Sequence, residues 1–153
     1  MPVTEASSRT GRTNGWLVIF PALVAVALVL YGLGTTSRNS RLYFLDSSRS
    51  KLVAENRELA LMGSIEERVQ SVLGELMLGP FSYSLQPLFT QDARLRVVMH
   101  RGNRLYVDVE MPDIAILNIP FSLIANAVER TLADSVPGAG TLELFVNGSL
   151  VSR

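Results

Sequence analysis

The chain has 153 residues, enough for one compact domain with a short appendage, and its 14 basic and 14 acidic side chains cancel. Without an excess of basic residues to attract phosphate groups, nucleic acid is not an expected partner. The absence of cysteine excludes disulfide frameworks, thiolate zinc sites, cysteine nucleophiles and a lipid-modified cysteine.

An apolar run without any charged residue extends from Trp16 to Leu33. At 1.5 Å of helical rise per residue, a run of this length spans roughly 27 Å, close to the hydrocarbon core of a bilayer. Trp16 and Tyr31 lie near its two ends, where aromatic rings meet the headgroup region. The sequence therefore predicts a short N-terminal tail at 1–15 and a transmembrane signal anchor at 16–34.

A cleaved signal peptide is the alternative interpretation of this run. Arg9 and Arg12 would form its basic region, and Gly32 and Gly34 are small residues placed like a cleavage site. The run exceeds a typical signal-peptide core of roughly 15 residues, which favours an uncleaved anchor. Since one span near the start of a chain usually leaves the large C-terminal part outside, we expect a single-pass protein of the cytoplasmic membrane with an extracytoplasmic domain.

Small polar residues at 35–40 predict a short linker, and the domain is expected to occupy 41–153. Residues 41–46 are aromatic and apolar and lead into an Asp-Ser-Ser turn, which predicts a first strand. The stretch 51–59 allows two structures. Its heptad-like spacing favours a helix, whereas its short length and flanking turns favour a strand paired with the first, which we prefer.

Ser64 and Glu67 form a capping-box pattern, which predicts that a helix begins there. Apolar residues then recur at helical spacing and form one stripe, made of Ile65, Val69, Val72, Leu73, Leu76 and Met77. Gly79 and Pro80 predict a left-handed cap and the end of this helix. Residues 81–92 are expected to form a loop with only short-range order.

Apolar and polar residues alternate on both sides of the segment 101–104, which predicts a β-hairpin with a tight turn. One face is expected to carry Leu95, Val97 and Met99 from the first strand and Leu105, Val107 and Val109 from the second. A sheet with one apolar face and one polar face is typical of helices that cover only one side.

A second amphipathic helix is predicted at 122–135, and a further strand at 141–148 that closes with an Asn-Gly turn. A stub at 149–152 returns from that turn. The predicted fold class is α/β of the α+β type. It is a small mixed sheet with two helices on one face, in the order ββαββαβ, preceded by one transmembrane helix.

Short motifs follow one another in a fixed order along 41–153. Their residues are Tyr43 and Phe44 in LYFLD, Leu52, Glu55 and Arg57 in an L-x-x-E-x-R pattern, Gly79 and Pro80 in LMLGP, Asp108 in YVDVE, Thr131 and Leu132 in AVERTL, and Asn147 and Gly148 in LELFVNG. Their order and spacing resemble the GerMN (sporulation and spore germination) domain. Two positions depart from that pattern, because Arg130 stands where asparagine is common and Glu110 follows Asp108 where a serine is frequent.

The resemblance implies a small domain similar to the ring-building motifs of secretion and sporulation channel proteins, carried outside the cytoplasmic membrane. It implies envelope assembly by protein contacts, without enzymatic activity, cofactor, metal or small-molecule substrate. The expected partners are envelope proteins, with self-association as a further option, and the membrane through the N-terminal helix.

Residue types that carry chemistry are sparse. His100 is the only histidine and lies beside a turn, so we interpret it as an exposed hairpin residue. Asp108 and Glu110 share a strand face and could work as an acid and base, although a solvated outer face is the favoured interpretation. The serines Ser64, Ser122 and Ser149 have no histidine beside them in a recognisable catalytic motif, and Gly138 to Gly140 lacks the lysine and spacing of a phosphate-binding loop. We interpret these residues as caps and turns.

The favoured function is a membrane-anchored, extracytoplasmic interaction domain. Its expected contact elements are an exposed sheet edge and the polar helix faces that carry Glu66, Gln70, Glu129 and Asp134. The alternative is a bitopic division-type coiled-coil scaffold built on 51–59. Gly63, Gly79 and Pro80 interrupt its heptads and weigh against it. An envelope enzyme is a third, minor option.

Overall fold

The computed structural model describes residues 16–34, 37–113 and 118–152. The chain divides into two compact units, Met1–Thr35 and Thr36–Arg153. In the first unit, α1 runs from Trp16 to Gly34 and coincides with the segment for which the sequence predicts an anchor. No helix in the described part of the chain combines the length and hydropathy expected of a membrane span. The predicted tail at 1–15 and the side chains of Trp16 and Tyr31 lie outside the described residues.

The first sheet of the second unit has three strands in the order β2-β1-β3. Strand β1 spans Ser37–Asp46, β2 spans Leu52–Ala60 and β3 spans Leu85–Gln86. The prediction that 37–40 belongs to a linker is wrong, because β1 begins at Ser37 and pairs with β2 from its first residue. The polar composition was misleading, since Ser40 is fully buried opposite Arg57.

The strand interpretation of 51–59 is confirmed by β2. A coiled-coil scaffold built on this stretch is therefore wrong, since the stretch forms a sheet and not a helix. The prediction of a plain loop at 81–92 needs a correction as well. Leu85 and Gln86 form β3 and pair antiparallel with the end of β1, with Leu85 opposite Asp46.

Helix α2 spans Ile65–Met77 and begins at the predicted capping box. The Ser64 hydroxyl accepts a hydrogen bond from the Glu67 backbone N–H at 3.2 Å, and the Glu67 carboxylate accepts one from the Ser64 N–H at 2.8 Å. These two bonds satisfy donors that a helix start otherwise leaves unpaired. The predicted apolar stripe is turned inward, with Val69, Val72, Leu73 and Leu76 buried.

The second sheet has four strands in the order β4-β5-β6-β7. They are β4 Arg94–Arg101, β5 Arg104–Glu110, β6 Thr141–Val146 and β7 Ser149–Ser152. Strands β5 and β6 are parallel, and the other two pairings are antiparallel. The mixed α+β class is as predicted. However, the strands of the described residues form two sheets and not one.

A β-bulge lies in β4 between Leu95 and Val97. Residues directly opposite each other on paired strands share a face, and Leu95, Val98 and His100 stand opposite the buried Val109, Val107 and Leu105. The bulge thus moves Val97 and Met99 to the outer face, where Val97 is 46% exposed. The prediction that they share a face with Leu95 is wrong, because an extra residue in a strand reverses the alternation beyond it.

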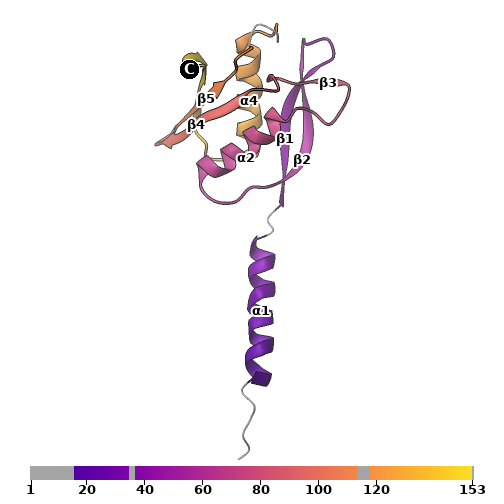
Figure 1. Cartoon of the computed structure of the whole chain (residues 1–153), viewed down its shortest axis with the longest axis vertical. Coiled ribbons are helices and arrows are strands. Elements are labelled where there is room, and N and C mark those ends of the chain that lie inside the picture. The colour runs from indigo at the N-terminus through magenta and orange to yellow at the C-terminus, as the bar shows by residue number, and fades with distance from the viewer. Residues whose placement is uncertain (1–15, 35–36, 114–117, 153) are drawn as a thin grey trace, which may run out of the picture. The chain divides into compact units, whose positions relative to one another are not determined.

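Helix α4 spans Phe121–Ser135, close to the predicted 122–135, and buries Ile124, Ala127, Val128, Thr131 and Leu132. It packs against β1 and β7, α2 packs against β4 and β1, and the two helices contact each other (Figure 1). The helices therefore contact both sheets and do not merely cover one face of one sheet. Large side chains from every layer meet in one core, among them Phe44, Leu73, Ile124, Leu105 and Leu144.

Candidate functional site

The candidate site is built around two charged residues of β2. Glu55 and Arg57 lie two residues apart on a strand, so their side chains leave the same face. Arg57 is 5% exposed and donates two hydrogen bonds to Oε1 of Glu55, from Nε at 2.9 Å and from Nη2 at 2.7 Å. Because a buried guanidinium is costly unless its donors are paired, its other contacts define the site.

The remaining donors of Arg57 reach the C-terminal end of α2. Nη1 donates to the backbone carbonyl and to Oε2 of Glu75, both at 3.1 Å, and Nη2 donates to the carbonyl of Gly79. Carbonyls at a helix C-terminus lack intrahelical partners and carry partial negative charge. Helix α2 has no basic residue in its last turn, so Arg57 supplies the positive charge from a neighbouring strand.

Gly79 reverses the chain at this point. Its φ of 86° lies in the left-handed region, and its N–H donates to the carbonyl of Leu76 at 3.2 Å, so the predicted cap is confirmed. Beyond Pro80, the Glu55 carboxylate accepts hydrogen bonds from the backbone N–H groups of Phe81 and Ser82, each at 3.1 Å. One ion pair therefore fixes the chain on both sides of the Gly-Pro turn.

The loop held in this way presents apolar side chains to solvent. Leu78 and Phe81 are 77% and 74% exposed, and Tyr83 is fully exposed. The guanidinium carbon of Arg57 lies 3.8 Å from the centre of the Phe81 ring, a cation–π contact that holds the ring in place. We call residues 78–83 the contact loop.

The contact loop borders a shallow hollow of about 490 Å³. Its lining contains no charged residue and includes Met77, Pro80, Phe81, Tyr83, Leu85, Pro87 and Phe89. Sequence reasoning treated Glu55, Arg57, Gly79 and Pro80 as motif residues and missed this surface. A signal was present, because the stretch between Glu75 and Asp92 lacks charge although much of it is loop.

The electrostatics of Glu55 follow from these contacts. Burial acts to raise the pKa of the Glu55 carboxyl, but the hydrogen bonds from Arg57, Phe81 and Ser82 together outweigh it, and the pKa lies below its usual value. Glu55 is therefore ionised at neutral pH, as its pairing with Arg57 requires.

A second group of motif residues joins β1 to α4. The Thr131 hydroxyl accepts a hydrogen bond from the Tyr43 backbone N–H at 3.0 Å, and the Tyr43 hydroxyl donates to Asp134 at 2.9 Å. The bond to Asp134 raises the pKa of Tyr43. Phe44 and Leu132 are buried in the core. This group holds β1 against α4.

A third group closes the C-terminal turn. Asn147 and Gly148 have φ of 51° and 77°, as expected for a turn that joins two antiparallel strands. The Asn147 side chain bonds both backbone groups of Met111, at 2.8 and 2.9 Å, and Asp108 accepts from the Gly148 N–H at 3.1 Å and lies 3.4 Å from Arg96. The interpretation of Asp108 as part of a solvated face is therefore incomplete, since it holds the turn, whereas Glu110 is exposed.

His100 is not the exposed hairpin residue that the sequence suggests. It lies on the inner face of β4, and its Nε2 is buried without a hydrogen-bond partner. Its backbone N–H donates to Glu66 of α2 at 3.2 Å. Within the described ranges, no group of three His, Asp or Glu side chains is placed to hold a metal ion.

The other sequence candidates have structural positions. Ser64 caps α2, Ser149 begins β7, and Gly138 and Gly140 have positive φ in the loop after α4. Ser122 is not a cap, because it lies inside α4, which begins after Pro120. Of the four polar helix residues expected to make contacts, Glu66 and Asp134 bond to their own domain, while Gln70 and Glu129 are exposed.

Comparison with known proteins gives a fold. No protein-family model matches the sequence, and no curated protein matches it. The structure is similar to the tandem GerMN domains of the sporulation protein GerM from Bacillus subtilis, with a TM-score of 0.52 and 15% identity, over 75% of this chain and 41% of that one. This chain thus spans less than half of the GerM structure. A putative lipoprotein from Clostridium perfringens gives a TM-score of 0.43 and 19% identity, over 74% and 76% of the two chains.

The similarity to GerM concerns the fold alone at this level of identity. The chain has a GerMN-like fold, as the order of its sequence motifs indicates.

Proposed function

We propose that this protein is a non-catalytic domain of the cell envelope that binds another protein through its contact loop and is held at the cytoplasmic membrane by α1. One observation carries the proposal. A buried, multiply bonded arginine binds the carbonyl of Gly79 and stacks on Phe81, within a loop that exposes Leu78, Phe81 and Tyr83. Exposed apolar clusters rimmed by polar residues are typical of interaction surfaces.

The free-energy cost of burying the Arg57 guanidinium supports this interpretation. Burying a guanidinium consumes free energy that a hydrophobic side chain would not consume. Arg57 nevertheless uses its donors to fix the carbonyl of Gly79 and, through Glu55, the N–H of Phe81. A fixed loop loses little conformational entropy on binding, which favours association. Aromatic side chains such as Phe81 and Tyr83 are the kind that anchor interfaces.

The proposed anchor rests on the character of α1. Its 19 residues carry no charge, and at 1.5 Å per residue they extend about 28 Å. Phe20, Leu23 and Leu28 are 70%, 63% and 65% exposed. A charge-free helix of this length approaches the thickness of a bilayer's hydrocarbon core, which supports the proposed anchor.

The test uses the full chain in membranes of its own host. A photo-crosslinking amino acid placed at Tyr83 is expected to give one discrete adduct with a single protein, and the adduct should disappear when Leu78 and Phe81 are changed to serine. The matched control changes Met62 and Leu150 to serine. These residues are 58% and 47% exposed outside the contact loop, so the adduct should persist.

Two results would contradict the proposal. One is an adduct that survives Leu78→Ser with Phe81→Ser. The other is its loss in the control variant while the domain stays folded by circular dichroism.

A further inference from the structure

The backbone of β2 has one side without a partner strand among the described residues. Strand β2 lies at the end of the first sheet, and its nine residues pair with β1 without a bulge. Tyr43 of β1 stands opposite Ala54, and its N–H donates to Thr131 of α4. Residues directly opposite each other in an antiparallel ladder exchange either two hydrogen bonds or none. Tyr43 and Ala54 therefore exchange none, and the backbone N–H and C=O of Ala54 point away from β1.

The same alternation holds along the whole strand. Because the pattern repeats every second residue, five residues direct their backbone groups to the free edge: Leu52, Ala54, Asn56, Glu58 and Ala60. Within the described ranges, these groups have no hydrogen-bond partner. The edge thus offers a row of unpaired donors and acceptors to another strand.

The opposite edge of the first sheet is closed. Besides the bond from the Tyr43 N–H to Thr131, the Ser135 hydroxyl of α4 donates to the carbonyl of Arg41 at 3.3 Å. Strand β3 pairs with the last two residues of β1. Helix α4 and β3 together leave β1 little room for a further strand.

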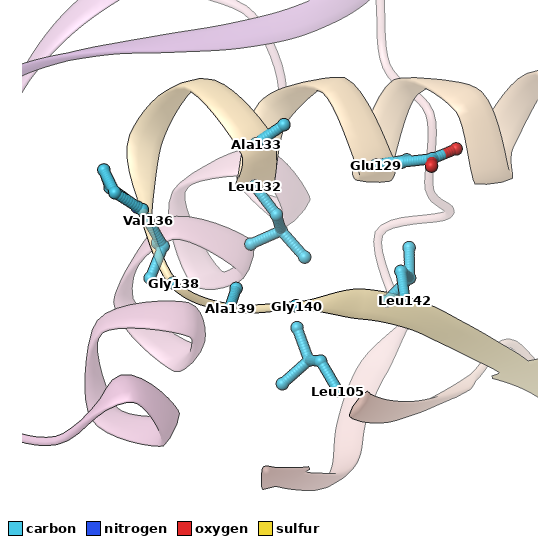
Figure 2. Close-up of a pocket in the computed structure, with 10 residues that line it drawn as sticks. Leu105, Glu129, Leu132, Ala133, Val136, Gly138, Ala139, Gly140 and Leu142 are labelled. Atoms are coloured by element: carbon cyan, nitrogen blue, oxygen red, sulfur yellow. The ribbon is translucent and has the colours of Figure 1, made fainter. Parts of the chain in front are cut away.

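The second sheet also restricts its edges. Its interior strands lie in the common core, where Leu105 of β5 and Leu142 of β6 point with Leu132 of α4 into the same space (Figure 2). The outer strand β4 contains a bulge, and its His100 N–H donates to Glu66 of α2 at 3.2 Å. The other outer strand, β7, has only four residues. Among the described strands, β2 is therefore the longest uninterrupted edge.

Features that protect an edge from another strand are scarce in β2. Proteins commonly block such edges with proline, lysine or a bulge, or keep the edge strand short. Residues 52–60 contain neither proline nor lysine. Of the five residues that face the edge, Glu58 alone is charged. The open edge is therefore suited to pairing with a second strand.

We propose that a second copy of this chain occupies this edge, with the two β2 strands antiparallel and Asn56 opposite Asn56 of the second copy. The sequence of β2 favours this alignment. It sets Glu55 opposite Arg57 of the second copy, and Val53, which is 40% exposed, opposite Leu59 of the second copy. Unlike charges and apolar side chains that stand directly opposite each other stabilise a strand pair.

The neighbouring alignments are disfavoured by charge. Moving the centre by one residue sets Glu55 against Glu55 or Arg57 against Arg57, and like charges directly opposite each other destabilise a pair. The Asn56 alignment also engages every residue that faces the edge, from Leu52 opposite Ala60 to Ala60 opposite Leu52. A symmetric pair of this kind closes on itself. It uses none of the residues 78–83, so it does not rest on the proposed function.

Disulfide cross-linking tests the pairing in the full chain, in membranes of its own host. The chain has no cysteine, so an introduced cysteine reports contacts between copies without background. Asn56→Cys should give a disulfide-linked dimer on mild oxidation, because opposite residues of a hydrogen-bonded pair have Cα atoms about 5.5 Å apart, within reach of a disulfide. The matched control is Asn126→Cys, an exposed asparagine of α4, which should give no more than a trace of dimer.

A mixed cross-link tests the alignment. Ala54 stands opposite Glu58 of the second copy, so Ala54→Cys and Glu58→Cys, produced together with different tags, should form a mixed dimer. Two copies of Ala54→Cys should cross-link less, because their cysteines would lie four residues apart along the strands, roughly 14 Å. A mixed dimer no more abundant than either variant alone would overturn the alignment.

A pair of charge variants tests the occupant. Combined with Asn56→Cys, Ala54→Glu places a carboxylate opposite Glu58 of the second copy at two symmetric positions and should lower the cross-linked fraction roughly twofold or more, while Ala54→Lys should preserve or raise it. Circular dichroism verifies that both variants are folded. Equal fractions in the two variants, or a yield for Asn56→Cys no higher than that for Asn126→Cys, would overturn the proposal. An adduct of Asn56→Cys with a different protein alone would also overturn it, because that protein would then occupy the edge.

Discussion

The guanidinium of Arg57 donates a hydrogen bond to the backbone carbonyl of Gly79, 22 residues further along the chain. This bond links β2, an edge strand, to the end of α2, and the chain that follows carries the contact loop. The stability of the domain and the shape of its proposed binding surface therefore depend on the same side chain.

Replacing Arg57 should be strongly destabilising. Arg57→Met leaves Glu55 and the carbonyl of Gly79 without their partner, and breaking a buried pair by removing one member costs about 3 to 5 kcal/mol. Chemical denaturation of residues 36–153 measures the change. The control is Arg104→Met, which removes an exposed pair with Glu143 and should cost less than about 1 kcal/mol. Similar losses in both variants would refute the special role of Arg57.

Two glycines of the same region should respond in opposite directions to alanine. Gly79 has a φ of 86°, so Gly79→Ala should cost about 1 to 2 kcal/mol through backbone strain, although a Cβ there meets only Pro87 at 3.7 Å. Gly74 lies within α2 and a Cβ there meets nothing within 4 Å, so Gly74→Ala should stabilise by about 0.5 to 1 kcal/mol. Denaturation midpoints that move in the same direction would show that the helix does not end at Gly79.

The helix end could be foreseen because its signals are local. Ser64, Glu67 and Gly79 act on their immediate neighbours, and their pattern is independent of the rest of the fold. The division into two sheets could not be foreseen, because the parallel pairing of Arg104 with Thr141 joins strands separated by a whole helix. Such pairings depend on packing that no short segment encodes.

The errors at His100 and Ser40 have a physical cause as well. A single-residue bulge near Arg96 reversed the expected side of His100, and alternation alone does not reveal a bulge. Ser40 is polar yet fully buried, at a position of β1 opposite Arg57 of β2. The contact loop was missed because Phe81 and Tyr83 carry no periodicity, and their exposure follows from where Arg57 holds the chain.

The two carboxylates at the end of β5 should differ in importance. Asp108→Ala removes the acceptor of the Gly148 N–H and the partner of Arg96, and should cost about 1 kcal/mol. Glu110→Ala, at an exposed position, should stay within about 0.5 kcal/mol. Urea denaturation of each variant distinguishes them, and equal midpoints would mean that Asp108 does not hold the turn.

Stability should depend on pH through Glu55. Its pKa is lowered in the folded state, so the unfolded state takes up a proton first as the pH falls. The stabilisation is fully present above the unfolded value near 4.5 and is lost as the pH falls through the lower folded value. Denaturation of wild type and Glu55→Gln at pH 7 and in steps below 4.5 tests this. The difference in unfolding free energy between the two proteins should narrow as the pH falls. A difference that stays constant would contradict the role assigned to Glu55.

The topology proposed for α1 is tested with a reporter. A reporter that is active only in the cytoplasm, fused after Arg153, should be silent, while one active only outside should give a signal. Two arginines placed within the charge-free helix, as Leu23→Arg with Val26→Arg, should release the chain from the membrane fraction, because charge at the centre of a span is costly. Strong cytoplasmic activity in the unaltered fusion would reverse the assignment.

The start of β1 also determines how the domain would bear tension. Two residues separate Gly34, the end of α1, from Ser37, where β1 pairs with Ala60 of β2. A pull transmitted through the tether therefore enters the domain at the first residue of its longest strand. A force along that strand loads every pairing from Ser37 to Leu45 in shear, so the hydrogen bonds resist together and do not open one after another. Beside it, β2 is bonded to α2 through Arg57, so the strand pair that takes this load is also connected to a helix.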